Sequence, residues 1–472
     1  MVMGSLREET EVAIIGAGPG GYVAALRAAD LGREVLLIEQ RERPGGVCLL
    51  EGCIPSKSLI HAVELVQAAR EAHQLGLTFK DLQVDTGLLR EWTDGIVDGL
   101  AQGIQGLLKR RGVEVLHGKA RFESDKALAI EGAEVSGVDF RHCIIASGSV
   151  INRIPPAYDL PVWSSADALR LPSVPGRLLV VGGGYIGLEL GLVYAGLGSR
   201  VTVVEFFPRL LGGADPDLVQ VVLRQCERRF ESILLESRVV GVEQAGSEFV
   251  VSVEHDLETK TRAFDQVLVA VGRRPNTSDL GLDRAGVKRT DPGTIEVSPE
   301  GRTNVPHIYA IGDAAPGPML AHKASREAKV VAEVIAGQPA AFDNRSIPAV
   351  VFTDPEIAWA GITEQEAAAS GVEVNVGRFP LAALGRARTL GRTEGLVKIL
   401  SDPHSGLILG VGMVGPMASE LIAEGSLALE MGATVEDLMV TIHPHPTMSE
   451  SIMEAAEVAA GLSVHVNPPR KR

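Results

Sequence analysis

Two segments of this chain, offset by 166 residues, repeat one pattern. Residues 12–39 read VAIIGAGPGGYVAALRAADLGREVLLIE, and residues 178–205 read LLVVGGGYIGLELGLVYAGLGSRVTVVE. Each copy has an apolar run, a G-x-G-x-x-G sequence, a helix-length stretch and a second apolar run that ends in glutamate. This order is typical of a strand, a glycine turn, a helix and a parallel strand. The repeat therefore predicts two βαβ units and an α/β fold.

The glycines and the terminal acid of each copy predict a dinucleotide site. In both copies the acid, Glu39 or Glu205, lies 23 residues after the first glycine. Glycines let the backbone approach a pyrophosphate, the helix N-terminus faces its negative charge, and the carboxylate accepts hydrogen bonds from ribose hydroxyls. The alternative is that both turns serve only tight packing. The six glycines are Gly16, Gly18, Gly21, Gly182, Gly184 and Gly187.

Charge and hydropathy exclude two kinds of partner. The net charge is −15, and basic residues cluster only in short runs such as residues 470–472, so we expect no nucleic acid partner. Residues 178–198 are apolar enough to suggest a membrane helix, but Glu189 and seven glycines in this stretch favour a strand, a turn and a helix. Residues 1–10 contain no apolar signal region. We therefore expect a cytoplasmic protein that does not bind a membrane.

The length of 472 residues predicts about three domains. Glycine fingerprints stop after about residue 345, where mixed strands and helices begin. In the sequence Ile-Gly-Asp, Asp313 is either a helix N-cap or a ligand contact. The expected strands are 143–148, 267–272, 307–313, 374–379, 395–400 and 408–414, and the expected late helices are 418–431 and 450–461.

Cys48 and Cys53 form the candidate redox pair. Residues five apart in a regular helix have Cα atoms roughly 8.6 Å apart, whereas a disulfide needs about 4.4–6.8 Å. A bridge would require a distorted turn, which Gly52 and Pro55 favour. A helix is expected over residues 56–69, and its N-terminal end would stabilise a Cys53 thiolate.

The four cysteines have a plainer interpretation as small buried thiols. We expect this role for Cys143, in a predicted strand, and for Cys226, in a charged helix. The C-x₄-C spacing of the other two fits no common zinc site, so no metal is expected.

The sequence HPHPTMSE near the C-terminus has two compatible interpretations. Pro444 and Pro446 hold the backbone at His445 extended. Thr447 and Glu450 have the spacing of a capping box that opens the last helix.

Taken in order, GAGPGGY, GGVCLLEGCIPSK, GGGYIGLE, VGRRPN, AIGDAAPGPMLAHKA and HPHPTMSE resemble the motifs of FAD-dependent pyridine nucleotide disulfide oxidoreductases. The resemblance extends from about Thr10 to Val464. It implies two Rossmann-like dinucleotide-binding domains, for FAD and NAD, and a C-terminal α+β dimerisation domain. The implied bounds are 1–150 and 279–345 for FAD, 151–278 for NAD, and 346–472 for dimerisation.

The same resemblance implies a role for each matching residue. Lys57 would lie beside the flavin N5 and pair with Glu189, and Asp313 would contact the flavin ribityl and pyrophosphate. The implied FAD residues are Gly16, Gly18, Gly21, Glu39, Lys57, Gly118, Asp313 and Ala321. The implied residues on the NAD side are Gly182, Gly184, Gly187, Glu189, Glu205, Val239 and Gly272.

For catalysis the resemblance implies a redox-active disulfide between Cys48 and Cys53. It makes His445 the catalytic base and Glu450 the residue that orients it, while His443 is expected to be structural. Positions 48 and 445 lie in different domains, so the base would come from the other subunit of a homodimer. Pro444 stands where the family usually has a small residue such as alanine.

The activity implied by the resemblance is oxidation of protein-bound dihydrolipoyl groups to lipoyl groups, with NAD⁺ as acceptor. The partners would be the lipoyl domains and core acyltransferase of a 2-oxo acid dehydrogenase complex. One alternative is a glutathione-type disulfide reductase, which Glu205 opposes and Arg209 leaves open. Another is a non-catalytic flavoprotein that serves as an assembly subunit.

Overall fold

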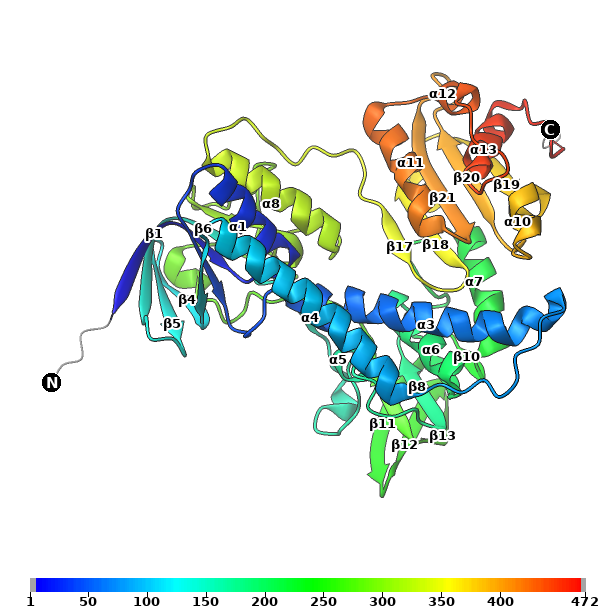
Figure 1. Ribbon diagram of the computed structural model, residues 1–472, viewed down its shortest axis with the longest axis horizontal. Coiled ribbons are helices and arrows are strands. Elements are labelled where there is room, and N and C mark those ends of the chain that lie inside the picture. Colours follow the sequence, from blue (N-terminus) through cyan, green and yellow to red (C-terminus); the bar gives the residue numbers. More distant parts are fainter. Residues whose placement is uncertain (1–5, 468–472) are drawn as a thin grey trace.

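The computed structural model describes residues 6–467 as three groups of sheets (Figure 1). The N-terminal sheet lies at the left of this view, the central sheets below and the C-terminal sheet at the upper right. Two long helices, α3 (Cys53–Glu71) and α4 (Thr86–Arg110), cross between them. The basic cluster 470–472 lies outside the described residues.

The N-terminal sheet has seven strands in the order β3-β2-β1-β6-β5-β4, with β16 also paired to β6. Strands β1, β2, β3, β6 and β16 are parallel, whereas β5 pairs antiparallel with β6 and β4 pairs antiparallel with β5. β2 is apolar except for its last residue and buried along its length, as a parallel strand covered on both faces must be. The strands are β1 (Arg7–Ile15), β2 (Val35–Glu39), β3 (Glu114–His117), β4 (Lys119–Ser124), β5 (Ala127–Glu131), β6 (Gly137–Ile145) and β16 (Ile308–Ala310).

The central part contains a four-stranded parallel sheet, β10-β9-β8-β14, beside a three-stranded antiparallel sheet, β11-β12-β13. A short antiparallel pair, β7 with β15, lies where the chain passes between the N-terminal and central sheets. The strands are β7 (Ser149–Ile151), β8 (Arg177–Val181), β9 (Arg200–Val204), β10 (Ser232–Leu234), β11 (Ser237–Ala245), β12 (Glu248–His255), β13 (Glu258–Phe264), β14 (Gln266–Val269) and β15 (Arg273–Pro275).

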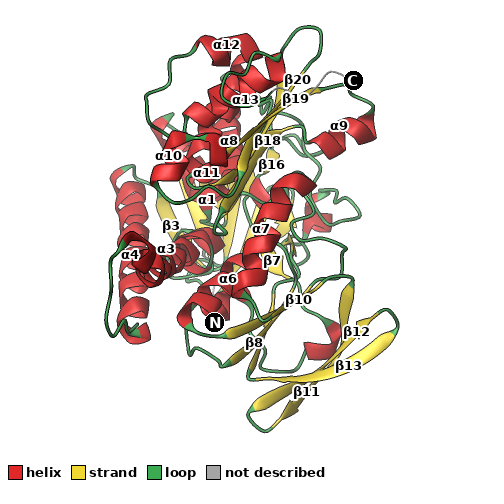
Figure 2. Ribbon diagram, turned by 90° about the vertical axis from the view of Figure 1, so that its right-hand side faces the viewer, coloured by secondary structure: helices red, strands yellow, loops and turns green. Residues whose placement is uncertain are grey.

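The C-terminal sheet is antiparallel, in the order β17-β18-β21-β20-β19. Helix α11 packs on β18 and β21, and α13 packs on β19 and β20 (Figure 2). The elements are β17 (Ala349–Val351), β18 (Glu356–Gly361), α9 (Glu364–Ser370), β19 (Asn375–Pro380), α10 (Gly385–Thr389), β20 (Leu396–Ser401), β21 (Ile408–Gly415), α11 (Ala418–Met431), α12 (Val435–Val440) and α13 (Glu450–Ala460).

The remaining helices complete the α/β units. Helices α1 and α8 pack against each other beside the N-terminal sheet. The helices are α1 (Pro19–Asp30), α2 (Gly46–Glu51), α5 (Ser165–Leu169), α6 (Tyr185–Leu197), α7 (Pro216–Arg229) and α8 (Ala321–Ile335). The short 3-10 helices are η1 (Ala72–Leu75), η2 (Pro155–Ala157), η3 (Leu282–Ala285), η4 (Gly312–Ala314) and η5 (Leu381–Ala383).

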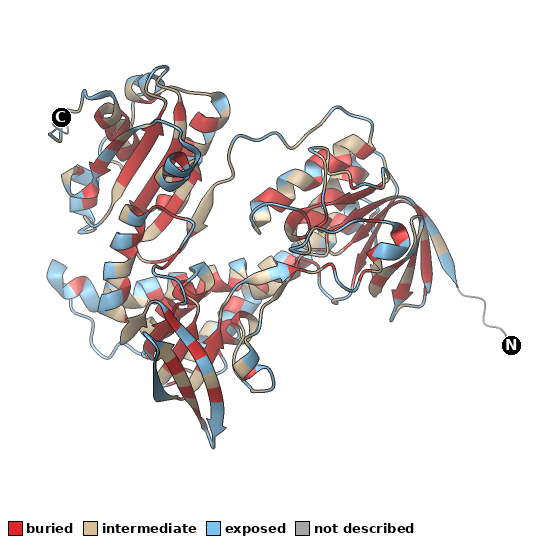
Figure 3. Cartoon of the chain, turned by 180° about the vertical axis from the view of Figure 1, so that it is seen from behind, coloured by how far each residue is buried: buried red, intermediate tan, exposed pale blue. Residues whose placement is uncertain are grey.

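Buried residues concentrate on the strands of each sheet (Figure 3). Cys143, on β6, and Cys226, on a helix at residues 216–229, are buried free thiols in apolar cores. This agrees with the expectation that both are small buried core residues. Residues 178–198 form β8, a glycine turn and α6, as expected. Within residues 6–467, every helix is too short or too polar to cross a membrane.

Of the two interpretations of Asp313, the N-cap is wrong, and the capping box expected at Thr447 and Glu450 is only half formed. Asp313 lies inside η4, whose N-cap is Ile311, and its carboxylate is bonded to a distant serine instead. The last helix begins at Glu450 with Ser449 at the N-cap, and Thr447 lies before it. Glu450 Oε2 still accepts a hydrogen bond from the Thr447 N–H, but the Thr447 hydroxyl donates to the Pro444 carbonyl and caps no helix N–H.

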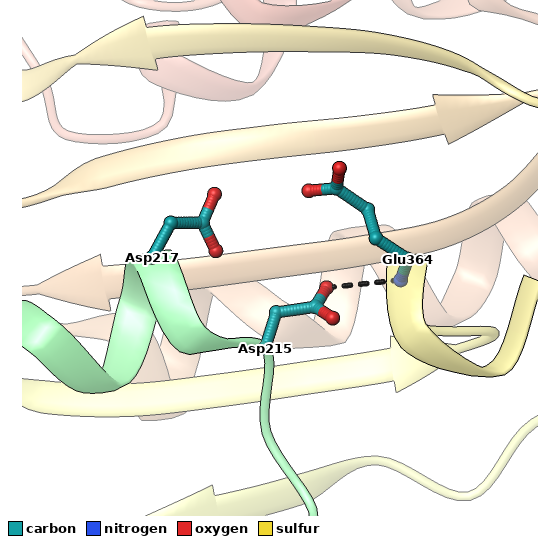
Figure 4. Close-up of side chains that lie close together, drawn as sticks. All are labelled: Asp215, Asp217 and Glu364. Carbon is teal, nitrogen blue, oxygen red and sulfur yellow. Dashed lines mark hydrogen bonds between the residues drawn. The ribbon is translucent and has the colours of Figure 1, made fainter. Parts of the chain in front are cut away.

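One buried cation joins the central and C-terminal parts. The Lys398 ammonium, on β20, lies 2.7 Å from a carboxylate oxygen of each of Asp215, Asp217 and Glu364. These acids form a cluster of the kind that holds a metal (Figure 4), but the lysine already supplies the positive charge. Burial opposes ionisation of Asp217, yet hydrogen bonds from Lys398 and Arg378 keep its pKa below the ordinary value.

Replacing Lys398 with methionine should therefore destabilise the fold. The side chain is 1% exposed, so its loss would leave the buried Asp215 carboxylate without its counter-charge. Removing one partner of a buried ion pair typically costs about 3–5 kcal/mol. We expect a clear fall in the midpoint of thermal unfolding, while Lys260→Met, at an exposed ion pair, should change it little. Equal midpoints for both variants would contradict this role.

Candidate active site

The glycine turns of the two βαβ units have the same geometry. Gly16 has φ +98° and Gly182 has φ +111°, a region that L side chains rarely adopt. At both positions a Cβ atom would come within 2.5 Å of a backbone carbonyl oxygen, that of Ala146 or Ala270. Only glycine therefore permits these two turns.

The acid at the end of each second strand closes its turn. Glu39 accepts a hydrogen bond from the Ala17 N–H at 2.7 Å, and Glu205 accepts one from the Gly183 N–H at 2.6 Å. Both glutamates are buried, and each lines a cavity beside its turn. The repeat in the sequence thus corresponds to a repeat in hydrogen bonding.

Each turn fits a pyrophosphate. At Gly18 and Gly184 an added Cβ would meet no atom closer than 3.8 Å, so the space in front of the backbone is open. Helices α1 and α6 begin at the next residues, Pro19 and Tyr185, and present their N-termini there. An open glycine surface at a helix N-terminus is suited to a phosphate group.

The predicted FAD residues surround the cavity of the first turn, which we call cavity 1. Gly21 is the exception, because it packs against the Gly16 carbonyl beneath the turn. Glu189, expected on the NAD side, also lines this cavity. The predicted residues that line cavity 1 are Gly16, Gly18, Glu39, Cys48, Cys53, Lys57, Gly118, Glu189, Asp313 and Ala321.

The predicted NAD residues surround a second cavity, cavity 2, at the other turn. Gly187 is again a packing residue, set against the Gly182 carbonyl. The predicted residues that line cavity 2 are Gly182, Gly184, Glu205, Val239 and Gly272. The two cavities share four lining residues, Tyr185, Ile186, Arg273 and Met319, so a common wall separates them.

The distorted turn expected between the two cysteines is present at Gly52. Helix α2 ends at Glu51 and α3 begins at Cys53, with Gly52 between them. A Cβ at Gly52 would lie 2.8 Å from the Val47 carbonyl oxygen, so glycine allows the chain to turn this tightly. Cys53 occupies the first position of a 19-residue helix, earlier than the start expected at residue 56.

The two cysteines are free thiols with different acidities. A hydrogen bond with the Cys48 side chain, aided by the Lys57 ammonium, lowers the pKa of Cys53 to about 7 against the effect of burial. The same hydrogen bond and burial raise the pKa of Cys48. In the reduced pair, Cys53 is therefore the thiolate and Cys48 the thiol near neutral pH.

Lys57 and Glu189 form an ion pair beside the cysteines. The Lys57 Nζ lies 2.8 Å from Glu189 Oε2, and the other oxygen accepts a hydrogen bond from the Phe352 N–H at 3.0 Å. Lys57 also lies over the Phe352 ring, 4.3 Å from its centre. Glu189 is 3% exposed, so this carboxylate holds the lysine in one position.

His445 is bonded to Glu450 but lies away from cavity 1. Its Nδ1 is 2.8 Å from Glu450 Oε1, and Oε2 accepts a hydrogen bond from the Thr447 N–H. Burial opposes ionisation of Glu450, but these hydrogen bonds lower its pKa. The imidazole is 78% exposed and is not among the residues that line cavity 1. His443, in contrast, is bonded to Glu424 and nearly buried.

Comparison with known proteins identifies the family. Residues 10–328 match the pyridine nucleotide-disulphide oxidoreductase family, and residues 347–456 match the dimerisation domain of that family. The chain belongs to this family, which confirms the resemblance and the fold class expected from the motifs. FAD and NAD are the cofactors of the family, as predicted.

Within the family, the similar curated proteins are dihydrolipoyl dehydrogenases. That of Geobacillus stearothermophilus is 44% identical over 99% of both chains, and that of Haloferax volcanii is 46% identical over 98% of this chain and 99% of its own. Among solved structures, LpdA from Mycobacterium tuberculosis has a TM-score of 0.87 at 28% identity, covering 95% of this chain and 99% of that one. The HOCl-induced flavoprotein disulfide reductase RclA from Escherichia coli has a TM-score of 0.84 at 28% identity, covering 94% and 98%.

Sequence reasoning missed several residues of the site. Ser149 is bonded to Asp313, and Tyr185, Arg273 and Met319 separate the two cavities. Arg273 belongs to the VGRRPN motif, which was used only for the resemblance. Tyr185 and Met319 likewise lie in the motifs GGGYIGLE and AIGDAAPGPMLAHKA, whereas Ser149 has no local pattern that sets it apart from an ordinary strand residue.

Proposed function

We propose that the chain works as a homodimer and oxidises protein-bound dihydrolipoyl groups to lipoyl groups with NAD⁺ as acceptor. The observation that carries this proposal is the cysteine pair, with Cys48 in α2 and Cys53 at the start of α3, in a cavity that shares a wall with a second dinucleotide turn. The cysteine pair lines the first dinucleotide cavity, and this cavity adjoins the second. Two electrons could therefore pass from the dithiol, through a nucleotide in cavity 1, to a nucleotide in cavity 2. The 42–46% identity to dihydrolipoyl dehydrogenases supports this choice of dithiol.

Thiol–disulfide exchange accounts for the first half of the reaction. A sulfur of the dihydrolipoyl group releases its proton to solvent and attacks Cys48 Sγ of the oxidised pair as a thiolate, the bond between Cys48 and Cys53 breaks, and Cys53 leaves as a thiolate. The second substrate sulfur, after losing its proton to His445, attacks the substrate sulfur bound to Cys48. Cys48 leaves with that proton as a thiol, and the lipoyl disulfide is complete.

The chain's own residues prepare the second half of the reaction. FAD, when bound in cavity 1, supplies the two-electron chemistry that passes a hydride to NAD⁺. The Lys57 ammonium, fixed by Glu189, stabilises the Cys53 thiolate that faces this cavity. Glu39 and Glu205 would accept the ribose hydroxyls of the two nucleotides.

The base in this mechanism comes from the second subunit. Within one chain His445 is exposed and outside cavity 1, so it needs a partner's cavity to act on Cys48. The match of residues 347–456 to a dimerisation domain supports this arrangement. Glu450 holds Nδ1, which leaves Nε2 to exchange protons with the substrate thiol.

Three further assignments complete the proposal. Residues 1–150 and 279–345 form the FAD-binding domain, 151–278 the NAD-binding domain and 346–472 the dimerisation domain. The partners are the lipoyl domains and core acyltransferase of a 2-oxo acid dehydrogenase complex. The cytoplasmic location expected from the sequence stays a prediction.

Reduction of NAD⁺ by dihydrolipoamide, in the presence of FAD, tests the proposed activity. Turnover that requires both cysteines would support it. Turnover with glutathione and NADPH, but none with dihydrolipoamide, would favour a glutathione-type reductase. A folded flavoprotein that turns over neither pair of substrates would favour the non-catalytic assembly subunit.

Cofactor preference should follow Glu205. Its carboxylate accepts both ribose hydroxyls but repels a 2′-phosphate, so we expect kcat/KM to favour NAD⁺ over NADP⁺ by at least about tenfold, equal to ~1.4 kcal/mol. Glu205→Ala should narrow this ratio, because it removes the attraction and the repulsion together. The matched control is Glu243→Ala, an exposed acid of β11, which should leave the ratio unchanged. Equal kcat/KM values for the two nucleotides in the unaltered protein would show the assignment to be wrong.

A further inference from the structure

The Asp313 carboxylate is held by a directed chain of hydrogen bonds. The Ser149 hydroxyl donates to Asp313 Oδ2 at 2.5 Å, and Arg273 Nε donates to the Ser149 Oγ at 2.8 Å. Arg273 Nη2 also donates to the Ser149 carbonyl at 2.8 Å. A guanidinium only donates, an ionised carboxylate only accepts, and a hydroxyl has one proton to give. The chain can therefore run only from Arg273 through Ser149 to Asp313.

The backbone beneath Asp313 is fixed separately. The Gly312 N–H donates to Glu327 Oε2 at 2.7 Å, and the Gly312 carbonyl accepts from the Lys323 Nζ at 3.0 Å. Lys323 and Glu327 are one turn apart on α8 and form an ion pair at 2.9 Å. The Gly312 N–H and carbonyl are thus both held, which restricts the backbone next to Asp313 and leaves its side-chain direction to be set by other contacts.

Arg273 reaches Ser149 because their two strands pair. Strands β7 and β15 pair antiparallel, and Ser149 of β7 lies opposite Pro275 of β15. Arg273 is two residues before Pro275 on β15. Ser149 is 6% exposed, so water does not readily replace the arginine. Arg273 is also the charged member of the four residues that separate cavity 1 from cavity 2.

We infer that Arg273 is a positioning residue for FAD: acting through Ser149, it fixes the direction in which the Asp313 carboxylate faces cavity 1. Without the arginine, the Ser149 hydroxyl is free to rotate and Asp313 loses its fixed partner. FAD would then have to order this side chain when it binds, and its affinity would fall. The inference rests on the assignment of Asp313 to FAD in the proposed function.

FAD affinity in four full-length proteins tests the inference: the unaltered chain, Arg273→Met, Asp313→Ala and the double variant. Apoprotein prepared from each holoprotein is titrated with FAD, and the quenching of flavin fluorescence gives Kd. We expect Arg273→Met to raise the Kd about tenfold, or ~1.4 kcal/mol. In the Asp313→Ala background the same change should alter Kd by less than about twofold, because groups that act through one path are not additive.

Two more variants separate a positioning role from general damage. Ser149→Ala removes the hydroxyl that links Arg273 to Asp313 and should raise the FAD Kd as Arg273→Met does. Arg274→Met is the matched control, since Arg274 is the neighbouring, exposed arginine on β15 and should leave Kd within twofold. A loss of affinity from Arg273→Met that is equally large with and without Asp313 would overturn the inference.

The remaining outcomes also decide the question. A rise in the Kd for NAD⁺ alone would make Arg273 a direct nucleotide contact and overturn the inference. If Asp313→Ala left FAD binding unchanged, Asp313 would not be an FAD contact, and the inference would be overturned. Because these titrations use no dithiol substrate, a failure to oxidise dihydrolipoamide would count against the proposed activity and leave the coupling between Arg273 and Asp313 standing.

Discussion

Replacing His445 with glutamine is expected to slow reduction of the cysteine pair by dihydrolipoamide by roughly 10²–10⁴-fold, the usual contribution of general acid–base catalysis. Glutamine keeps a polar side chain but cannot take the substrate proton. Reduction of FAD by NADH should change little, because that step does not involve the histidine. Rapid mixing of the protein with dihydrolipoamide alone, and separately with NADH alone, measures the rates of these two half-reactions. The exposed His404→Gln serves as the matched control and should alter neither.

A mixture of two inactive homodimers tests whether the base crosses between subunits. Cys48→Ser lacks the attacked sulfur, and His445→Gln lacks the base. In a mixed dimer, one of the two sites would contain both groups intact, so activity should return when subunits exchange. Exchange is shown independently by co-purification with a tagged subunit. Proven exchange without recovered activity would place His445 and Cys48 in the same chain.

Replacing Cys53 with serine should abolish turnover and also remove the long-wavelength charge-transfer absorption of a thiolate beside oxidised FAD. Cys53 is the sulfur whose pKa is lowered, by its hydrogen bond with Cys48 and by Lys57. Cys48→Ser should also abolish turnover, but it keeps the Cys53 thiolate and a hydroxyl donor beside it. The visible spectrum of each variant measures this difference. Absorption that survives in Cys53→Ser and is lost in Cys48→Ser would reverse the two roles.

The same absorption should depend on pH in a defined direction. Since the pKa of Cys53 is lowered to about 7, the thiolate is the main form above this pH and the thiol below it. In the two-electron-reduced protein the band should be full at pH 8 to 9 and fade as the pH falls through about 7. A band of constant strength down to pH 5 would show that Lys57 and the bound cofactor lower the pKa further than the structure indicates.

The parts of the fold that repeat or alternate were predictable from the sequence. The two βαβ units follow from the spacing of Gly16, Glu39 and their second copies, because each residue serves a local turn. The distorted turn at Gly52 was predictable because a bridge between cysteines five positions apart requires one and because Gly52 and Pro55 favour it. In both βαβ units the hydrogen bond that closes the turn joins residues only 22 positions apart, as between Glu39 and the Ala17 N–H.

The features that sequence reasoning missed depend on long-range partners. Asp313 has the local appearance of an N-cap, but Ser149, 164 positions away, takes its carboxylate. Lys398 is an ordinary strand lysine in the sequence, and only the packing of two domains surrounds it with acids.

An anaerobic titration of the purified holoprotein with dihydrolipoamide tests the central claim most directly. Addition of one equivalent should produce the long-wavelength absorption of a Cys53 thiolate beside FAD, and subsequent NAD⁺ should remove it while an equal amount of NADH appears. Cys143 and Cys226, both buried, should stay unreactive throughout. If the flavin spectrum does not respond to dihydrolipoamide but NADH still bleaches it, the cysteine pair does not accept electrons from a dihydrolipoyl group, and the proposed function is wrong.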